Sequence, residues 1–152
     1  MKKIFIYYSF TGNGDIVASF LKEKGYDIKK IITKEPLSKN KVLAIMTGGF
    51  KALIGYKDKI EDLNIDLDKY HEILIGSPIW NSRISSPINT VLSELNLDNR
   101  NVNFILYSAS GNATNALNKI SKNYKKSKVI VLKEPKDNRE EINKKLKNGL
   151  GS

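Results

Sequence analysis

The chain of 152 residues contains no cysteine, a single histidine and a single tryptophan. Without cysteine it can form no disulfide, no thiolate metal site and no iron–sulfur centre. His71 is the only imidazole, and it has no carboxylate or second histidine at the spacing of metal ligands, so we expect no metal site and interpret His71 as a surface residue. Ser9 and Ser77 lack a base partner, so we expect no hydrolytic residues. Any redox chemistry would need a bound cofactor.

Long hydrophobic runs are also missing. No apolar stretch approaches the roughly 18 residues that cross a bilayer. The basic and apolar start, MKKIFIYYSF, stops at Thr11-Gly12 and has no small-residue cleavage site, so we interpret it as a first strand and not as a signal peptide. These features favour a cytoplasmic protein without membrane insertion.

Arginine is scarce, although the net charge is +10. The charge comes from lysine, with clusters at residues 22–34 and 119–128. Readers of nucleic acid favour arginine at base edges or aromatic residues on an exposed sheet, and the chain shows neither pattern, so we expect no nucleic-acid partner. Two interpretations of the lysines stay open: they are solvated faces of a lysine-rich chain, or they attract an acidic partner.

Strand and helix patterns alternate along the whole chain. A chain of this length forms one domain, which we place at residues 1–148, followed by a frayed tail at 149–152. The predicted strands are residues 2–8, 26–33, 72–76, 102–107 and 128–132. The predicted helices are residues 15–24, 41–56, 87–95, 113–124 and 138–146. This order predicts an α/β fold with a parallel sheet covered by helices on both faces.

The segment at residues 35–69 is the hardest to assign. Met46-Thr-Gly-Gly-Phe50 interrupts the helical pattern, because two glycines inside a helix cost about 2 kcal/mol. The segment is a helix, a broken helix or a loop.

The clearest local motif lies between the first strand and the first helix. It reads Ser9-Phe10-Thr11-Gly12-Asn13-Gly14-Asp15. A loop rich in glycine and hydroxyl groups exposes backbone N–H groups at the helix N-terminus, where the helix dipole also favours an anion such as phosphate. The motif is neither a Walker loop nor the three-glycine dinucleotide fingerprint. It is either a phosphate site or a tight turn with a helix cap, and Asp15 is expected to complement the helix dipole.

Two further polar loops follow later strands. The first, Gly76-Ser77-Pro78-Ile79-Trp80-Asn81, places the only tryptophan after the third strand, where it either stacks on a flat ligand or packs on the protein itself. The second, Ser108-Ala109-Ser110-Gly111, follows the fourth strand. Because ligands of open parallel sheets bind beyond the carboxyl ends of the strands, we expect the three loops to form one rim.

Two of these motifs resemble the flavodoxin family. Its first loop typically reads Thr/Ser-x-Thr-Gly-Asn-Thr, and its second reads Gly-Ser-Pro-Ile-Trp or close to it. The order of elements is similar from Lys2 to about Leu146. The resemblance implies a flavodoxin-like three-layer sandwich whose five parallel strands have the order 2-1-3-4-5, with flavin mononucleotide (FMN) bound non-covalently.

The resemblance also implies the residues that hold FMN. The phosphate would lie against the loop formed by Ser9, Phe10, Thr11, Gly12, Asn13 and Gly14. The isoalloxazine ring would lie beside the loop formed by Pro78, Ile79, Trp80, Asn81, Ser82 and Arg83. The other side of the ring would contact the loop formed by Ser108, Ala109, Ser110 and Gly111. Two interpretations of Arg83 stay open: its guanidinium lies near the ring and stabilises the anionic reduced flavin, or it is a solvated loop arginine.

Three departures from the family pattern affect the expected chemistry. Gly14 replaces a threonine, which removes one hydroxyl from the phosphate and weakens binding without excluding it. Asn81 and Ser82 stand where many relatives have a glycine, so the backbone flip that accompanies one-electron reduction is less favoured. The third loop has no aromatic residue, so that face of the flavin is open to a substrate or partner.

These features leave three candidate functions. The leading one is an electron carrier that a reductase loads and an acceptor protein unloads, with the charge of +10 suited to acidic redox partners. The alternative is an NAD(P)H-dependent FMN enzyme of the same fold that reduces quinones or nitro compounds. The third is a flavin-free interaction domain.

Overall fold

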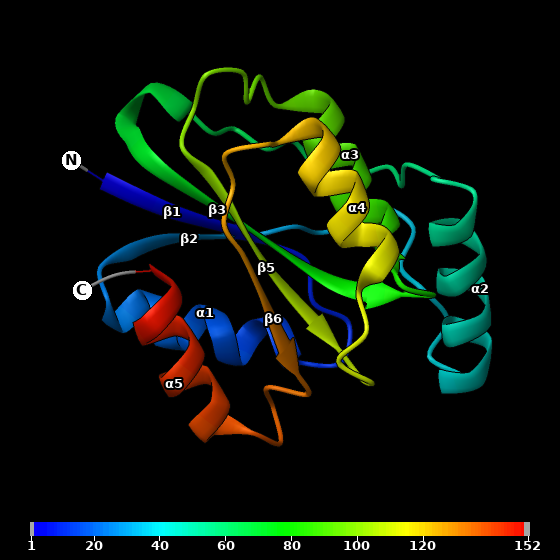
Figure 1. Ribbon diagram of the computed structural model, residues 1–152. Coiled ribbons are helices and arrows are strands. Elements are labelled where there is room, and N and C mark those ends of the chain that lie inside the picture. Colours follow the sequence, from blue (N-terminus) through cyan, green and yellow to red (C-terminus); the bar gives the residue numbers. More distant parts are fainter. Residues whose placement is uncertain (1, 151–152) are drawn as a thin grey trace.

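The computed structural model describes residues 2–150 and forms an α/β fold (Figure 1). Its elements follow one another as β1 (Lys2–Tyr7), α1 (Asn13–Glu23), β2 (Tyr26–Lys30), α2 (Lys41–Leu53), the 3-10 turn η1 (Leu67–Lys69), β3 (Tyr70–Trp80), β4 (Arg83–Ile84), α3 (Ser86–Glu94), β5 (Val102–Ser108), α4 (Thr114–Asn123), β6 (Val129–Lys133) and α5 (Arg139–Leu150). The predicted alternation of strands and helices is confirmed.

The five long strands form one parallel sheet in the order β2-β1-β3-β5-β6. Counted along the chain without the short β4, this is the predicted order 2-1-3-4-5. The strand β4 was not predicted. It pairs antiparallel with the end of β3, where Ile79 lies opposite Ile84 and Trp80 opposite Arg83.

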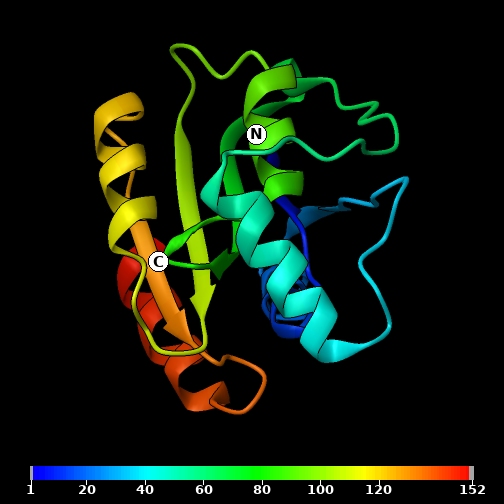
Figure 2. The same ribbon diagram turned by 90° about the vertical axis from the view of Figure 1, so that its right-hand side faces the viewer.

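Helices cover both faces of the sheet (Figures 1 and 2). Alternate residues of a strand point to opposite faces, so Ile73 and Ile75 of β3 join the core beneath α3 and α4, whereas Leu74 joins the core beneath α1 and α5. All three side chains are almost fully buried. The apolar strands therefore hold the sheet between two helical layers, as parallel sheets require.

The helix α2 covers neither face of the sheet. It stands beyond the tip of β3 and contacts β3, β4 and α3 (Figure 1). Only the small residues Ala44, Gly48 and Ala52 are buried on its inner side. A Cβ atom on Gly48 would lie 3.1 Å from Cε3 of Trp80, so glycine lets the helix approach the indole closely. Within the segment at residues 35–69 that the sequence left open, residues 41–53 form an unbroken helix packed through Gly48, and residues 54–66 form a loop before η1.

Several element boundaries differ from the predicted ones. The strand β2 ends at Lys30, three residues early, and β3 extends in both directions to Tyr70 and Trp80. The last helix includes Gly149 and Leu150, which were expected in a frayed tail, while residues 151–152 lie outside the described residues. None of the helices between residues 2 and 150 is both long and apolar enough to cross a membrane.

His71 is not the surface residue that the sequence suggested. It lies within β3 and is partly buried. Its Nδ1 atom is buried and has no hydrogen-bond partner among the described residues. The longer strand explains the difference, because a residue expected to precede the strand is part of it.

Candidate cofactor-binding cleft

A cleft of about 810 Å³ lies at the carboxyl ends of β1, β3, β5 and β6. This volume is within the range of pockets that hold small-molecule ligands. The cleft is lined by Phe10, Thr11, Asn13, Lys41, Ile45, Met46, Gly49, Phe50, Leu53, Pro78, Ile79, Trp80, Asn81, Tyr107, Ala109, Glu134, Lys136 and Asp137. Segments far apart in the sequence thus meet at the sheet edge where ligands of such folds bind.

The loop from β1 to α1 forms one end of the cleft. Gly12 precedes the helix in a left-handed conformation, with φ 95°, and as a glycine supplies no side-chain cap. The Ser9 hydroxyl accepts a hydrogen bond of 3.1 Å from the N–H of Gly14. The N–H groups of Asn13 and Asp15 have no hydrogen-bond partner among the described residues, so they and the positive end of the helix dipole are available to an anion. This end of the cleft is therefore suited to a phosphate group.

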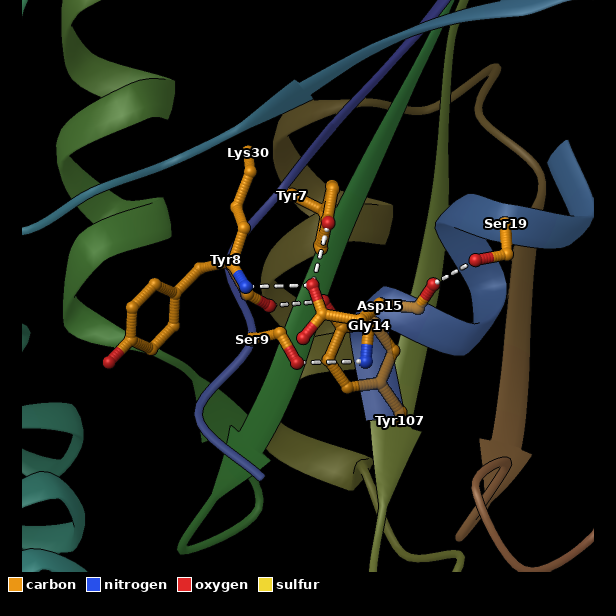
Figure 3. A network of polar contacts seen from close by, with 8 residues as sticks. All are labelled: Tyr7, Tyr8, Ser9, Gly14, Asp15, Ser19, Lys30 and Tyr107. Atoms are coloured by element: carbon orange, nitrogen blue, oxygen red, sulfur yellow. Dashed lines mark hydrogen bonds and ion pairs between the residues drawn. The ribbon is translucent and has the colours of Figure 1, made fainter. Parts of the chain in front are cut away.

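A polar network around Asp15 fixes this loop at the start of α1 (Figure 3). Asp15 accepts hydrogen bonds from the Tyr7 hydroxyl at 2.7 Å and from Lys30 Nζ at 2.8 Å. Burial acts to raise the pKa of Asp15, but the hydrogen bonds from Lys30 and Tyr7 outweigh it and leave this pKa below its ordinary value. Asp15 lies in the first turn of α1, as expected. Because Lys30 balances its charge, Asp15 repels an anion at the loop less than a lone carboxylate would.

The structure explains why Gly14 replaces a threonine. A Cβ atom at this position would lie 2.6 Å from the Tyr107 hydroxyl and 2.7 Å from Cδ2 of Tyr7. The hydroxyl of Tyr107 donates a hydrogen bond to the carbonyl of Tyr8, which holds that side chain against the loop. The two tyrosines occupy the space that a larger residue would need.

We expect Gly14→Ala to lower the free energy of unfolding by about 1–3 kcal/mol, the usual cost of overpacking a filled core. Urea unfolding followed by far-UV circular dichroism measures this change. Gly49→Ala is the matched control: no atom lies within 4 Å of the added Cβ in α2, so this variant should gain about 0.5–1 kcal/mol. Equal stability of Gly14→Ala and the unsubstituted chain would contradict the packing described here.

Trp80 lies at the other end of the cleft, at the end of β3. Its ring meets the ring of Tyr8 edge to face, with centroids 5.9 Å apart and planes at 88°. The same indole packs against Gly48 and lines the cleft. Trp80 therefore packs on the protein, as one of the two interpretations predicted, and it also lines the cleft, so stacking on a flat ligand stays a prediction.

The turn after Trp80 is firmly held. Asn81 and Ser82 both have positive φ, of 50° and 63°, as the central residues of a two-residue β-hairpin do. The Asn81 carbonyl accepts from Arg83 Nη1 at 3.1 Å. Ser82 accepts from the backbone N–H groups of Asn115 and Ala116, so it caps α4. These contacts oppose a change in the backbone conformation of the turn. That the backbone flip on one-electron reduction of a bound flavin is less favoured here stays a prediction.

The structure brings only part of the predicted set into the cleft. The predicted residues that line it are Phe10, Thr11, Asn13, Pro78, Ile79, Trp80, Asn81 and Ala109. Ser9, Gly12 and Gly14 belong to the same first loop but do not line the cleft. Ser108 and Ser110 form hydrogen bonds within their own loop, where Gly111 turns with φ 79°.

Arg83 lies away from the cleft. It lines a different cavity, between α2 and α4, together with Asn89 and Lys119. Arg83 lies directly opposite Trp80 in the β3–β4 hairpin, but its guanidinium donates to the carbonyl of Asn81 and it is not among the residues that line the cleft. The expected effect of this guanidinium on a flavin is therefore not supported.

Sequence reasoning missed the residues of the cleft that come from α2 and from the loop after β6. Ile45, Met46, Phe50 and Leu53 form an apolar wall, although more than half of the Ile45, Met46 and Phe50 surfaces is exposed. Their spacing had indicated a helix but not its orientation. Lys136 comes from the loop between β6 and α5, and no local motif marks it.

Comparisons with known proteins agree with this fold. No protein-family model matches the chain, and no curated protein matches its sequence. Among solved structures, a flavoprotein from Lactobacillus acidophilus NCFM in complex with FMN has a TM-score of 0.69 and 22% identity, covering 91% of this chain and 97% of its own. Two proteins provisionally described as flavoproteins also match. The one from Bacteroides eggerthii DSM 20697 has a TM-score of 0.75 and 20% identity, covering 99% of both chains.

The protein from Bacteroides uniformis ATCC 8492 has a TM-score of 0.67 and 18% identity, covering 93% of this chain and 97% of its own. At these identities the likeness shows the fold. The chain has a flavodoxin-like α/β fold, with its cleft at the carboxyl edge of the sheet.

Proposed function

We propose that this chain binds FMN non-covalently in the cleft and transfers electrons through it. The observation that carries the proposal is that one cleft joins the N-terminus of α1, with its free N–H groups at Asn13 and Asp15, to an apolar wall that includes Trp80. FMN has the matching parts, a phosphate at one end and a flat ring system at the other. The FMN that the Lactobacillus acidophilus structure contains supports the same assignment.

The residues of the cleft fit this cofactor. Gly49 faces the cleft with no atom within 4 Å of a Cβ placed on it, so backbone can approach a flat ring there. The N–H groups at the start of α1 would bind the phosphate, while Trp80 and Phe50 would shield the ring from water. Bound FMN would supply the redox chemistry, by accepting and donating electrons, and the protein would set its position and its electrostatic surroundings.

An electron carrier with a net charge of +10 would meet acidic redox partners, because complementary charge raises the rate of encounter. We expect reduction by such a partner to slow as the salt concentration rises, because the attraction between exposed charges is screened.

The exposed apolar wall of α2 favours a second candidate, an NAD(P)H-dependent reductase of quinones or nitro compounds. Met46 and Phe50 are 67% and 61% exposed beside the cleft, so an aromatic substrate could reach a flavin along them. Steady oxidation of NAD(P)H by the purified protein with a quinone, and without any added reductase, would favour this enzyme over the carrier.

The test of cofactor binding is direct. We expect the protein to retain the absorbance bands of oxidised flavin after it is mixed with FMN and desalted, with one flavin per chain. A colourless protein after desalting, with no saturable binding in solution, would instead favour the flavin-free interaction domain.

A further inference from the structure

The loop between β6 and α5 places one lysine directly on the predicted phosphate loop. The backbone N–H of Lys136 donates a hydrogen bond of 2.9 Å to Oδ1 of Asn13. Its Nζ lies 3.4 Å from the carbonyl oxygen of Thr11, and its Cδ would lie 3.7 Å from a Cβ on Gly12. The hydrogen bond from its backbone therefore fixes Lys136 beside the phosphate loop. Its side chain lies along Thr11 and Gly12, just before α1.

This position is unfavourable for a lysine in the protein alone. The N-terminus of a helix carries partial positive charge, so cations are stabilised at the opposite end. The ion pairs among residues 2–150 do not include Lys136, and a backbone carbonyl is the one acceptor that the structure gives its ammonium group there. Lys136 thus has no ion-pair partner among the described residues, and the one carboxylate in the first turn of α1, Asp15, is paired with Lys30.

The surroundings of Lys136 leave this charge available to a ligand. Glu134 and Asp137 come from the same loop and also line the cleft, but none of the ion pairs among residues 2–150 joins either of them to Lys136. The nearby carboxylate of Asp15 is already bonded to Lys30. An anion bound between the Lys136 ammonium and the first turn of α1 would interact favourably with both.

We propose that Lys136 is the charged ligand of the FMN phosphate and the residue by which this cleft selects FMN over riboflavin. The inference rests on the proposed function. It also accounts for Gly14, where the tyrosines leave no room for a threonine hydroxyl: the ammonium group from a distant loop supplies a stronger, charge-assisted contact in its place.

The experiment compares Lys136→Gln with the matched control Lys126→Gln. Lys126 is an exposed lysine before β6, at the opposite end of that strand from the cleft. Quenching of Trp80 fluorescence gives the dissociation constants of FMN and riboflavin for each protein. We expect Lys136→Gln to weaken FMN at least about tenfold, as for loss of a hydrogen bond to a charged group, and to leave riboflavin unchanged. We expect Lys126→Gln to bind both flavins like the unsubstituted chain.

Two further readouts separate a phosphate ligand from a structural residue. The affinity of FMN should depend less on salt in Lys136→Gln than in the unsubstituted chain, and Lys136→Arg should keep most of the preference for FMN. Without ligand, Lys136→Gln should unfold at the same or a slightly higher temperature, because a cation is removed from a helix N-terminus. A merely structural role would instead lower that temperature.

The outcomes distinguish this inference from the function on which it rests. If the unsubstituted chain binds FMN and Lys136→Gln keeps the same ratio of FMN to riboflavin affinity, the role of Lys136 is overturned and the proposed function stands. If the unsubstituted chain binds neither flavin, the proposed function fails, and the role of Lys136 fails with it.

Discussion

Asp58→Ala is expected to lower the free energy of unfolding by about 3 kcal/mol, the lower end of the cost of breaking a buried ion pair. Asp58 is 5% exposed and accepts from Lys51 Nζ and from the Ser86 hydroxyl, each at 2.5 Å. Its backbone carbonyl accepts from the Thr90 hydroxyl at 2.6 Å. We expect the lower end of this range because 20% of the Lys51 side chain is exposed, so water can solvate its ammonium group once the carboxylate is removed.

The effect should extend to α2, because Lys51 lies in the last turn of that helix. Burial and the charge of Asp58 together raise the pKa of Tyr8 to about 12, so the variant should also lower this pKa. Urea unfolding gives the stability, and ultraviolet titration of the tyrosines gives the pKa. Asp62→Ala, at an exposed carboxylate nearby, should change stability by no more than about 0.5 kcal/mol. Equal losses in the two variants would show that Asp58 does not anchor α2.

Gly12→Val combined with Thr11→Ala is expected to weaken FMN binding by more than about 100-fold, because two or more hydrogen bonds to a charged phosphate would be lost. Gly12 has φ 95°, a conformation in which a β-branched residue is strongly strained. A valine there would shift the backbone at the start of α1 and misdirect its N–H donors. Isothermal titration with FMN measures the loss.

Gly25→Val is the control for strain alone. Gly25 has φ 81° just after α1, at the opposite end of the helix from the cleft, with no atom within 4 Å of an added Cβ. Both variants should lose stability, but Gly25→Val should keep its affinity for FMN. Undiminished affinity in the double variant would place the phosphate elsewhere.

Much of the fold could be predicted because its causes are local. Apolar runs mark the strands β1, β3, β5 and β6, and glycine and polar residues mark where these runs end. The motifs at Thr11 and Trp80 were found for the same reason, since the first follows β1 and the second ends β3. The two motifs lie close together because the carboxyl ends of parallel strands are at the same edge of the sheet.

The features that sequence reasoning missed depend on contacts between distant residues. A Cβ on Gly48 would meet Trp80, so the glycine that seemed to break α2 is what allows the helix to pack with its large apolar residues outward. The strand β4 has two residues, too few for any periodicity, and its Asn-Ser turn is a weaker hairpin signal than Asn-Gly. Lys136 reaches Asn13 across 123 positions of sequence.

The most direct test of the account is a crystal structure of the protein grown with excess FMN. It should show the phosphate against residues 9–14 and the ring system in the cleft beside Trp80. A crystal in which the protein's own side chains fill the cleft, or in which FMN binds at another surface, would contradict the binding of FMN in this cleft.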